Sequence, residues 1–228
     1  MLATTPRHAI VSGASSGIGE AICQRLLRDG WQVTGLSRRA PSWQEPLFQH
    51  RSLDLSQTDS IAEVVSDLSA DAIVHAAGMM RAAPLGTLDP AISAQLWRLH
   101  VEVAERMVDG MLPRLSDGGR IVLIGSRAAT GIAGRSQYSA GKAALVAMAR
   151  AWAQELLPRR ITVNVVAPGT TDTAMLRDPA RANNAPKIPP MGRLITPEEV
   201  AALACFLLGA EAGAITGQQI FICGGSSL

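Results

Sequence analysis

The sequence predicts one α/β domain over residues 1–228, built on a Rossmann-type doubly wound parallel sheet of about seven strands with helices on both faces. Short apolar runs alternate with segments of helical spacing along the whole chain. The runs hardly alternate with polar residues, which is typical of parallel strands that are covered on both faces. No linker, repeat or low-complexity segment divides the 228 residues, and 47% apolar content is enough for one packed core.

Seven apolar runs, most of them β-branched, are the predicted strands. They are 9–11, 32–36, 47–53, 72–76, 120–124, 161–167 and 219–222. Helical periodicity separates them, for example in 61–68, where apolar residues recur at i, i+3, i+4 and i+7. Near the end, Thr196-Pro197-Glu198-Glu199 has the residues of a helix start, with a cap followed by proline and acids.

Composition excludes several classes of protein. Lys and Arg number 21 against 19 acids, so the net charge of +2 gives no basic face for nucleic acid. The 3 cysteines are far apart and lack metal-ligand spacing, which predicts no metal site and a reducing, cytoplasmic location. No signal peptide is expected before the first strand, and no apolar stretch is long enough to cross a membrane.

A glycine-rich turn joins the first predicted strand to the first helix, at Gly13, Gly17 and Gly19. Bare backbone here permits a tight turn, close approach to a phosphate and close helix packing. The helix N-terminus then offers its N–H groups to an anion. The turn, with Ser15, Ser16 and Ile18, is therefore a candidate dinucleotide site; the alternative is a tight turn without a ligand.

The second predicted strand ends at Ser37-Arg38-Arg39. An acid at this place would accept hydrogen bonds from the adenosine ribose 2′-hydroxyl and select NAD. Guanidinium groups instead suit a 2′-phosphate, so the sequence favours NADP(H) over NAD(H). The alternative is that both arginines are simply solvated.

The candidate reacting groups follow the fifth predicted strand. Ser126 comes just after it, and Tyr138, the chain's only tyrosine, lies four residues before Lys142 at the start of a helix. This spacing places the phenol and the ammonium on one side of the helix. A nearby cation favours phenolate and brings a tyrosine closer to acid–base use at neutral pH. Taken alone, the pair is also consistent with a chance arrangement on a solvated face.

These motifs, in this order, resemble the short-chain dehydrogenase/reductase family along nearly the whole chain, in particular its 3-oxoacyl carrier-protein reductases. The matching residues are Ser12-Gly13-Ala14-Ser15-Ser16-Gly17-Ile18-Gly19, Asp54-Leu55, Ala76-Ala77-Gly78, Ser126, Tyr138-Ser139-Ala140-Gly141-Lys142, and Pro168-Gly169 with Thr171 and Thr173.

The resemblance implies a role for each of these residues. Tyr138 would be the acid–base residue, Ser126 would hold the substrate oxygen, and Lys142 would bind the nicotinamide ribose and tune Tyr138. Asp54 would contact adenine, Gly78 would lie by the adenosine ribose, and the segment from Pro168 to Thr173 would receive the nicotinamide carboxamide. The resemblance further implies a homotetramer or homodimer, with contacts from helices around 96–115 and 138–157 and from the C-terminal strand.

Four features depart from the family pattern, three of them single positions and one a spacing. His75 and His100 stand where the family usually has asparagine, and His100 aligns with its fourth catalytic residue. The resemblance implies that this asparagine serves a proton-relay water largely through its backbone carbonyl, which histidine also provides. Imidazole, however, can itself titrate near neutral pH. Ser126 and Tyr138 are twelve residues apart, one fewer than usual, so a tighter loop is expected. Cys223 replaces a frequent aspartate and is expected to be a buried strand cysteine.

The sequence says least about the substrate. Residues 173–196, rich in proline, are a candidate lid over the site, or else an ordinary surface connection. Several methionines and a leucine are candidates for an adaptable apolar pocket or for plain packing: Met79, Met80, Met175, Leu176 and Met191. Arg81 or Arg127 could instead meet an acidic group.

Three functions compete on this basis. The first is an NADPH-dependent reductase that transfers a hydride to a ketone by Ser126, Tyr138 and Lys142, with His100 as a further catalytic candidate. The second is a non-enzymatic NADP(H)-binding sensor, which would not need all three groups. The third is an NAD-dependent alcohol dehydrogenase, which the lack of an acid at Ser37 opposes.

Overall fold

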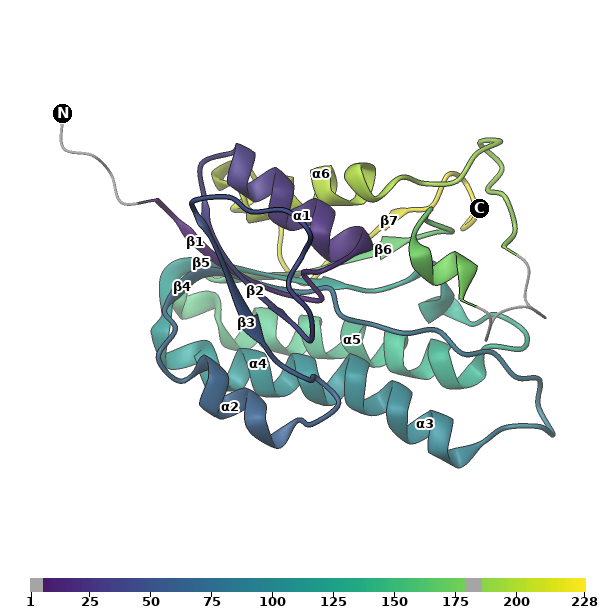
Figure 1. Ribbon diagram of the computed structural model, residues 1–228. Helices are drawn as coiled ribbons and strands as arrows, with labels where there is room; N and C mark the ends of the chain where they lie inside the picture. Colours follow the sequence, from purple (N-terminus) through teal and green to yellow (C-terminus); the bar gives the residue numbers. More distant parts are fainter. Residues whose placement is uncertain (1–5, 179–185) are drawn as a thin grey trace.

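The computed structural model describes residues 6–178 and 186–228. Its core is one sheet of parallel strands in the order β3-β2-β1-β4-β5-β6-β7 (Figure 1). The strands are β1 (His8–Ser12), β2 (Gln32–Ser37), β3 (Phe48–Ser52), β4 (Ala70–His75), β5 (Leu115–Ile124), β6 (Thr162–Pro168) and β7 (Gln219–Ile222). The predicted fold class is confirmed.

Strand boundaries differ most at β5, which begins at Leu115 although the apolar run begins five residues later. The intervening residues are polar or glycine and partly exposed, so hydrophobic patterning carries no signal there. The pairing of β4 with β5 also shifts register between Ala70 and Ala72. The apolar runs therefore mark the buried part of each strand rather than its full length.

Two helical layers cover the sheet (Figure 1). The helices are α1 (Gly17–Arg28), α2 (Asp59–Val65), α3 (Pro90–Trp97), α4 (Val103–Met111), α5 (Ser136–Glu155) and α6 (Pro197–Leu208). α1 and α6 pack on one face, and α2, α4 and α5 on the other. Among the described helices, none combines the length and apolar character that crossing a membrane requires.

The five central strands, β2, β1, β4, β5 and β6, contribute side chains to both cores, which explains their lack of alternation. In β1, Ala9 and Val11 pack under α1 and α6, whereas Ile10 packs with the opposite helices. All three are fully buried. The two cores thus hold the central strands from both faces, so a site can form only at the ends of these strands.

The carboxyl ends of the central strands lie along one edge of the sheet. Ser12 pairs in register with Leu36 of β2 and with His75 of β4. Beyond β1, the Gly13 N–H donates to the Leu36 carbonyl at 2.9 Å. The arginines that follow β2 therefore lie beside the glycine turn, as the sequence predicts.

α6 begins with a reciprocal capping arrangement, as its sequence predicts. Thr196 Oγ1 accepts the Glu199 N–H at 3.2 Å, and Glu199 Oε2 accepts the Thr196 N–H at 2.9 Å. The helix buries Val200 and Leu207 completely. Two N–H groups of the first turn, which have no partner inside the helix, are thereby satisfied.

We expect Thr196→Ala to lower the free energy of unfolding by about 1 kcal/mol, because it removes an N-cap. Urea denaturation measures this. Ser66→Ala is the control, since that hydroxyl bonds only the local Glu63 carbonyl in an exposed position, and it should change the unfolding free energy by less than about 0.5 kcal/mol. Equal effects of the two substitutions would contradict the capping role.

Candidate active site

A cleft of about 240 Å³ opens at the carboxyl edge of the sheet. It brings together most of the residues that the sequence singles out. Those lining it are Gly13, Ser16, Gly17, Ile18, Gly19, Ala76, Ala77, Gly78, His100, Ser126, Tyr138, Lys142, Pro168, Gly169, Thr171 and Thr173. Ser15, Ser37, Arg38, Arg39, Asp54 and Leu55 are not part of this lining.

The glycine turn needs its bare backbone. Gly13 has φ +72°, and a Cβ there would lie 2.8 Å from the Ala77 backbone. Gly17 has φ +58° and opens α1, while a Cβ on Gly19 would overlap the Gly13 carbonyl. The turn therefore carries the start of α1 directly to the cleft, and the amides there suit the phosphates of a dinucleotide.

Ser12 and His75 hold the glycine turn against the segment after β4. Ser12 Oγ accepts the N–H groups of Ala76 and Ala77 at 3.2 and 3.3 Å, and lies 2.9 Å from His75 Nδ1. Because the hydroxyl accepts twice, its own proton goes to His75 Nδ1. The imidazole proton therefore sits on Nε2.

His75 is fully buried and neutral. Burial, and next the charge of Lys142, lowers the pKa of His75 to about 3, against the opposing effect of the Leu99 and His100 carbonyls. Its buried Nε2 lies near these two carbonyls but does not reach hydrogen-bond geometry with any described residue. His75 is thus a structural support of the site, where sequence reasoning noted only a departure.

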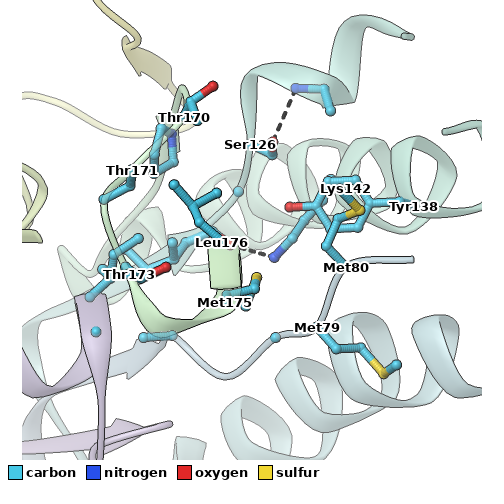
Figure 2. Close-up of a pocket in the computed structure, with 18 of the residues that line it drawn as sticks. Met79, Met80, Ser126, Tyr138, Lys142, Thr170, Thr171, Thr173, Met175 and Leu176 are labelled. Carbon is cyan, nitrogen blue, oxygen red and sulfur yellow. Dashed lines mark hydrogen bonds between the residues drawn. The ribbon is translucent and has the colours of Figure 1, made fainter. Parts of the chain in front are cut away.

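Ser126, Tyr138 and Lys142 converge on the cleft (Figure 2). Ser126 precedes the short helix η3 (Arg127–Thr130), and its Oγ accepts the Ala128 N–H at 3.1 Å. The hydroxyl proton is then directed to another acceptor, such as a substrate oxygen. Tyr138 and Lys142 come from the first turns of α5.

Lys142 is held out of water, with 4% of its surface exposed. Its Nζ donates to the Ile124 carbonyl at the end of β5, at 2.8 Å. Burial lowers the pKa of Lys142 to about 7, so charged and neutral forms coexist near neutral pH. An anionic ligand in the cleft would favour the charged form.

His100 lies in the π-helical turn η1 (Arg98–Glu102), which joins α3 to α4 in one continuous helix. Its Nε2 accepts the Met79 N–H at 3.2 Å, so its proton sits on Nδ1. The ring is fully buried and meets the Tyr138 ring edge-on, with centroids 5.4 Å apart. Burial, and next the charge of Lys142, lowers the pKa of His100 well below its usual value, which disfavours a charged imidazole in this position.

Two glycines make room for the His100 ring. A Cβ on Gly78 would lie 3.3 Å from its Nε2, and a Cβ on Gly141 would lie 3.3 Å from its Nδ1. Both distances are tighter than ordinary contacts. Gly141 directly precedes Lys142 in the sequence. Its contact with the ring of His100, forty-one positions earlier, becomes visible only in the structure.

The arginines after β2 lie outside the cleft lining and are exposed. Asp54 also lies at this end of the sheet, and its carboxylate accepts the Ser56 N–H and hydroxyl. These bonds, and more weakly the charge of Arg38, lower the pKa of Asp54. The groups expected around adenosine therefore neighbour one another, beside the glycine turn.

Sequence reasoning missed part of the lining. Gly125 directly follows the buried strand β5, and this position could have indicated it, whereas Thr170 lies within the predicted segment from Pro168 to Thr173. The predicted lid, 173–196, is described only in part, because 179–185 lie outside the described residues. Asp178, which ends the part before them, pairs with Arg81 at 2.9 Å.

The sequence predicts no metal site, and the described residues are the ones in which such a site can be sought. Among those the structure describes, His, Cys, Asp and Glu side chains form no group of three or more that could hold an ion.

Cys223 is buried directly after β7, where Ser227 Oγ lies 3.1 Å from its Sγ. Hydrogen bonds from Ser227 and from neighbouring backbone N–H groups lower its pKa, although burial opposes them.

Comparison with known proteins decides the family. A family model described as enoyl-(acyl carrier protein) reductase matches residues 13–227. The acetoacetyl-CoA reductase of Rhizobium meliloti (strain 1021) is 35% identical over 238 residues, which cover 96% of this chain and 98% of that protein. A crystal structure of a short chain dehydrogenase family protein from Francisella tularensis superposes with a TM-score of 0.88 at 26% identity, covering 97% and 98% of the two chains. The chain belongs to the short-chain dehydrogenase/reductase family.

Two further relatives of this short-chain dehydrogenase/reductase bear on its site. The 3-oxoacyl-[acyl-carrier-protein] reductase FabG of Aggregatibacter actinomycetemcomitans is 35% identical over 240 residues, covering 95% of this chain and 97% of that protein. A blue fluorescent protein from a metagenomic library, solved in complex with NADPH, gives a TM-score of 0.86 at 27% identity over 97% and 98% of the two chains. Family membership makes this protein an oxidoreductase.

The buried histidines predict acid sensitivity that an asparagine variant would reduce. Unfolded His75 binds a proton below its ordinary pKa of 6.5, whereas the folded protein resists this until about pH 3. Stability that His75 contributes is therefore lost as pH falls through this window. We expect the unfolding free energy of His75→Asn, relative to wild type, to improve by about 1 kcal/mol per pH unit between pH 6 and 5. Urea denaturation at both values measures it, and parallel curves would contradict it.

Proposed function

We propose that this protein reduces a ketone with NADPH and that 3-oxoacyl thioesters are its best substrate candidates. One observation carries the proposal. Ser126, Tyr138 and a buried Lys142 face one cleft, beside a glycine turn that needs bare backbone. A binding module without chemistry has no need to hold an ammonium group out of water at that place.

The cleft residues fit a nicotinamide dinucleotide. The first turn of α1 suits its phosphates, and Lys142 suits its ribose, because two of its protons remain for acceptors in the cleft. When bound, the reduced nicotinamide supplies a hydride to the substrate carbonyl carbon.

The chain itself supplies the proton and holds the carbonyl group. Ser126 donates a hydrogen bond to the carbonyl oxygen through its hydroxyl, because its own oxygen is already an acceptor for the Ala128 N–H. Tyr138 then protonates this oxygen as negative charge develops on it. The Lys142 ammonium stabilises the phenolate that remains until solvent returns the proton.

His100 takes the position of the family's fourth catalytic residue. A neutral, buried ring cannot supply protons near pH 7, so we assign its contribution to the carbonyl in the π turn. Such turns often occur at functional sites because they free backbone groups from the helix. The ring itself packs against Tyr138.

Apolar side chains support an acyl substrate. Met79, Met80, Met175 and Leu176 line the cleft around the three reacting groups (Figure 2). Flexible thioethers adapt to acyl chains of different shape. The names of the relatives, acetoacetyl-CoA reductase and 3-oxoacyl-[acyl-carrier-protein] reductase, support a thioester with a ketone at its third carbon.

We further propose that the protein works as a homotetramer or homodimer in the cytoplasm, with residues 173–196 covering the substrate. Trp97 is 47% exposed beside a groove between α3 and α5, which supports a helical contact between subunits. Met175 and Leu176 in the cleft support the covering role. Light scattering coupled to size-exclusion chromatography measures the subunit number.

The assay that tests the reaction follows NADPH consumption with acetoacetyl-CoA and other 3-oxoacyl thioesters at neutral pH. We expect Tyr138→Phe to reduce kcat by about 10²–10⁴-fold, since it loses the proton donor. The dissociation constant for NADPH should change less than about twofold, because the ring remains. Full activity of this variant would overturn the mechanism. Tight NADPH binding by the wild type with no turnover on any ketone would favour the sensor function.

The cofactor is tested separately by fluorescence titration with NADPH and NADH. We expect Arg38→Ala to weaken NADPH binding by roughly 1.5–3 kcal/mol, the size of a charge-assisted hydrogen bond, and NADH binding far less. Arg150→Ala removes the same charge from an exposed position farther along α5 and is the control. A wild-type preference for NADH would instead support an NAD-dependent alcohol dehydrogenase.

A further inference from the structure

Three consecutive carbonyl groups in the turn after β2 are all hydrogen-bonded within the protein. The Ser37 carbonyl accepts the Leu53 N–H at 3.1 Å and lies 3.0 Å from His50 Nε2. The Arg38 carbonyl accepts from the Ser52 hydroxyl at 3.4 Å. The Arg39 carbonyl accepts from the Ser37 hydroxyl at 2.8 Å. This pattern spans the segment that carries the candidate phosphate ligands.

The hydrogen bonds define the protonation of His50. The single hydroxyl proton of Ser37 goes to the Arg39 carbonyl, so Ser37 Oγ can only accept from His50 Nε2, 3.2 Å away. The Ser37 carbonyl can also only accept. His50 Nε2 therefore carries a proton and donates it to both oxygens of Ser37.

Residues of β3 hold this turn through hydrogen bonds, while the two arginines of the turn are exposed to solvent. The parallel register pairs Gly35 with His50 and Ser37 with Ser52. Ser37 is 5% exposed, whereas Arg38 and Arg39 are exposed beside the glycine turn. Ser37 is thus held inside the protein, whereas the charged groups that follow it on the same backbone segment are exposed.

This arrangement has an electrostatic consequence for an anion. A phosphate is repelled by carbonyl oxygens and attracted by guanidinium groups. When all three carbonyls are engaged with β3 or with the turn itself, the segment can present its arginines without presenting carbonyl oxygens to the ligand. Losing the His50 donor would leave the Ser37 carbonyl with only the Leu53 N–H and would remove the donor to the Ser37 hydroxyl oxygen, which would loosen the turn.

We propose that His50 is a positioning residue for the 2′-phosphate of NADPH, acting through the Ser37–Arg39 turn. The inference rests on the proposed cofactor and adds a residue from β3 to the groups that select it. The proposed effect of His50 on the phosphate is indirect, because it acts through hydrogen bonds to Ser37.

The test compares His50→Phe with His50→Gln by fluorescence titration with NADPH, NADH, 2′,5′-ADP and 5′-AMP. The phenylalanine variant fills the site without a donor, and the glutamine variant keeps an N–H donor of similar reach. We expect His50→Phe to weaken NADPH and 2′,5′-ADP about fivefold, the size of one net hydrogen bond, and NADH and 5′-AMP less than about twofold. His50→Gln should restore most of the phosphate preference.

A control variant and a substitute variant make the result specific. Gln49→Ala changes an exposed neighbour on β3 and should leave all four affinities unchanged. If His50→Phe does not fold, His50→Met gives the same readout with a flexible apolar side chain. Equal weakening of phosphorylated and unphosphorylated ligands, or no weakening of either, would overturn the proposed role of His50.

The same titrations separate this inference from the cofactor assignment. A wild-type protein without preference for NADPH, together with equal effects of Arg38→Ala on both cofactors, would overturn the assignment itself. A wild-type preference that is lost in Arg38→Ala but unchanged in His50→Phe would overturn only the role of His50.

Discussion

The Lys142 ammonium group, buried against the end of β5, is the constraint around which the site is organised. Its bond to the Ile124 carbonyl joins α5 to the sheet and fixes the charge at the cleft. A cation in this position disfavours charge on its neighbours, and both buried histidines have lowered pKa values partly for this reason. The site is therefore built from neutral polar groups around one titratable amine, whose charge depends on what enters the cleft.

The two histidines show how a change of residue type is absorbed by its surroundings. His100 is larger than the asparagine usual in the family, and the glycines at positions 78 and 141 leave the volume that its ring fills. His75 is accommodated through hydrogen bonding, since the Ser12 hydroxyl donates a hydrogen bond to its Nδ1 and accepts hydrogen bonds from two backbone N–H groups. Neighbouring residues therefore accommodate both histidines, His100 by leaving space for its ring and His75 by donating a hydrogen bond to it.

The parallel sheet and the grouping of Ser126, Tyr138 and Lys142 could be predicted from the sequence, because apolar runs and motif spacing are local signals. Three features did not. The start of β5 is polar and carries no pattern. The π turn at His100 depends on backbone hydrogen bonds that no residue type announces. The contact of His50 with Ser37 arises from strand register, which links positions thirteen residues apart.

Tyr138 is the one tyrosine of the chain, and it stands inside the cleft. A tyrosine-specific spectroscopic probe therefore needs no assignment in this protein. Biosynthetic incorporation of fluorotyrosine would place a single ¹⁹F nucleus on the ring that packs edge-to-face against His100. Ionisation of that phenol, its response to each ligand and its exchange with solvent would then be visible directly in a one-line spectrum, without altering any other side chain.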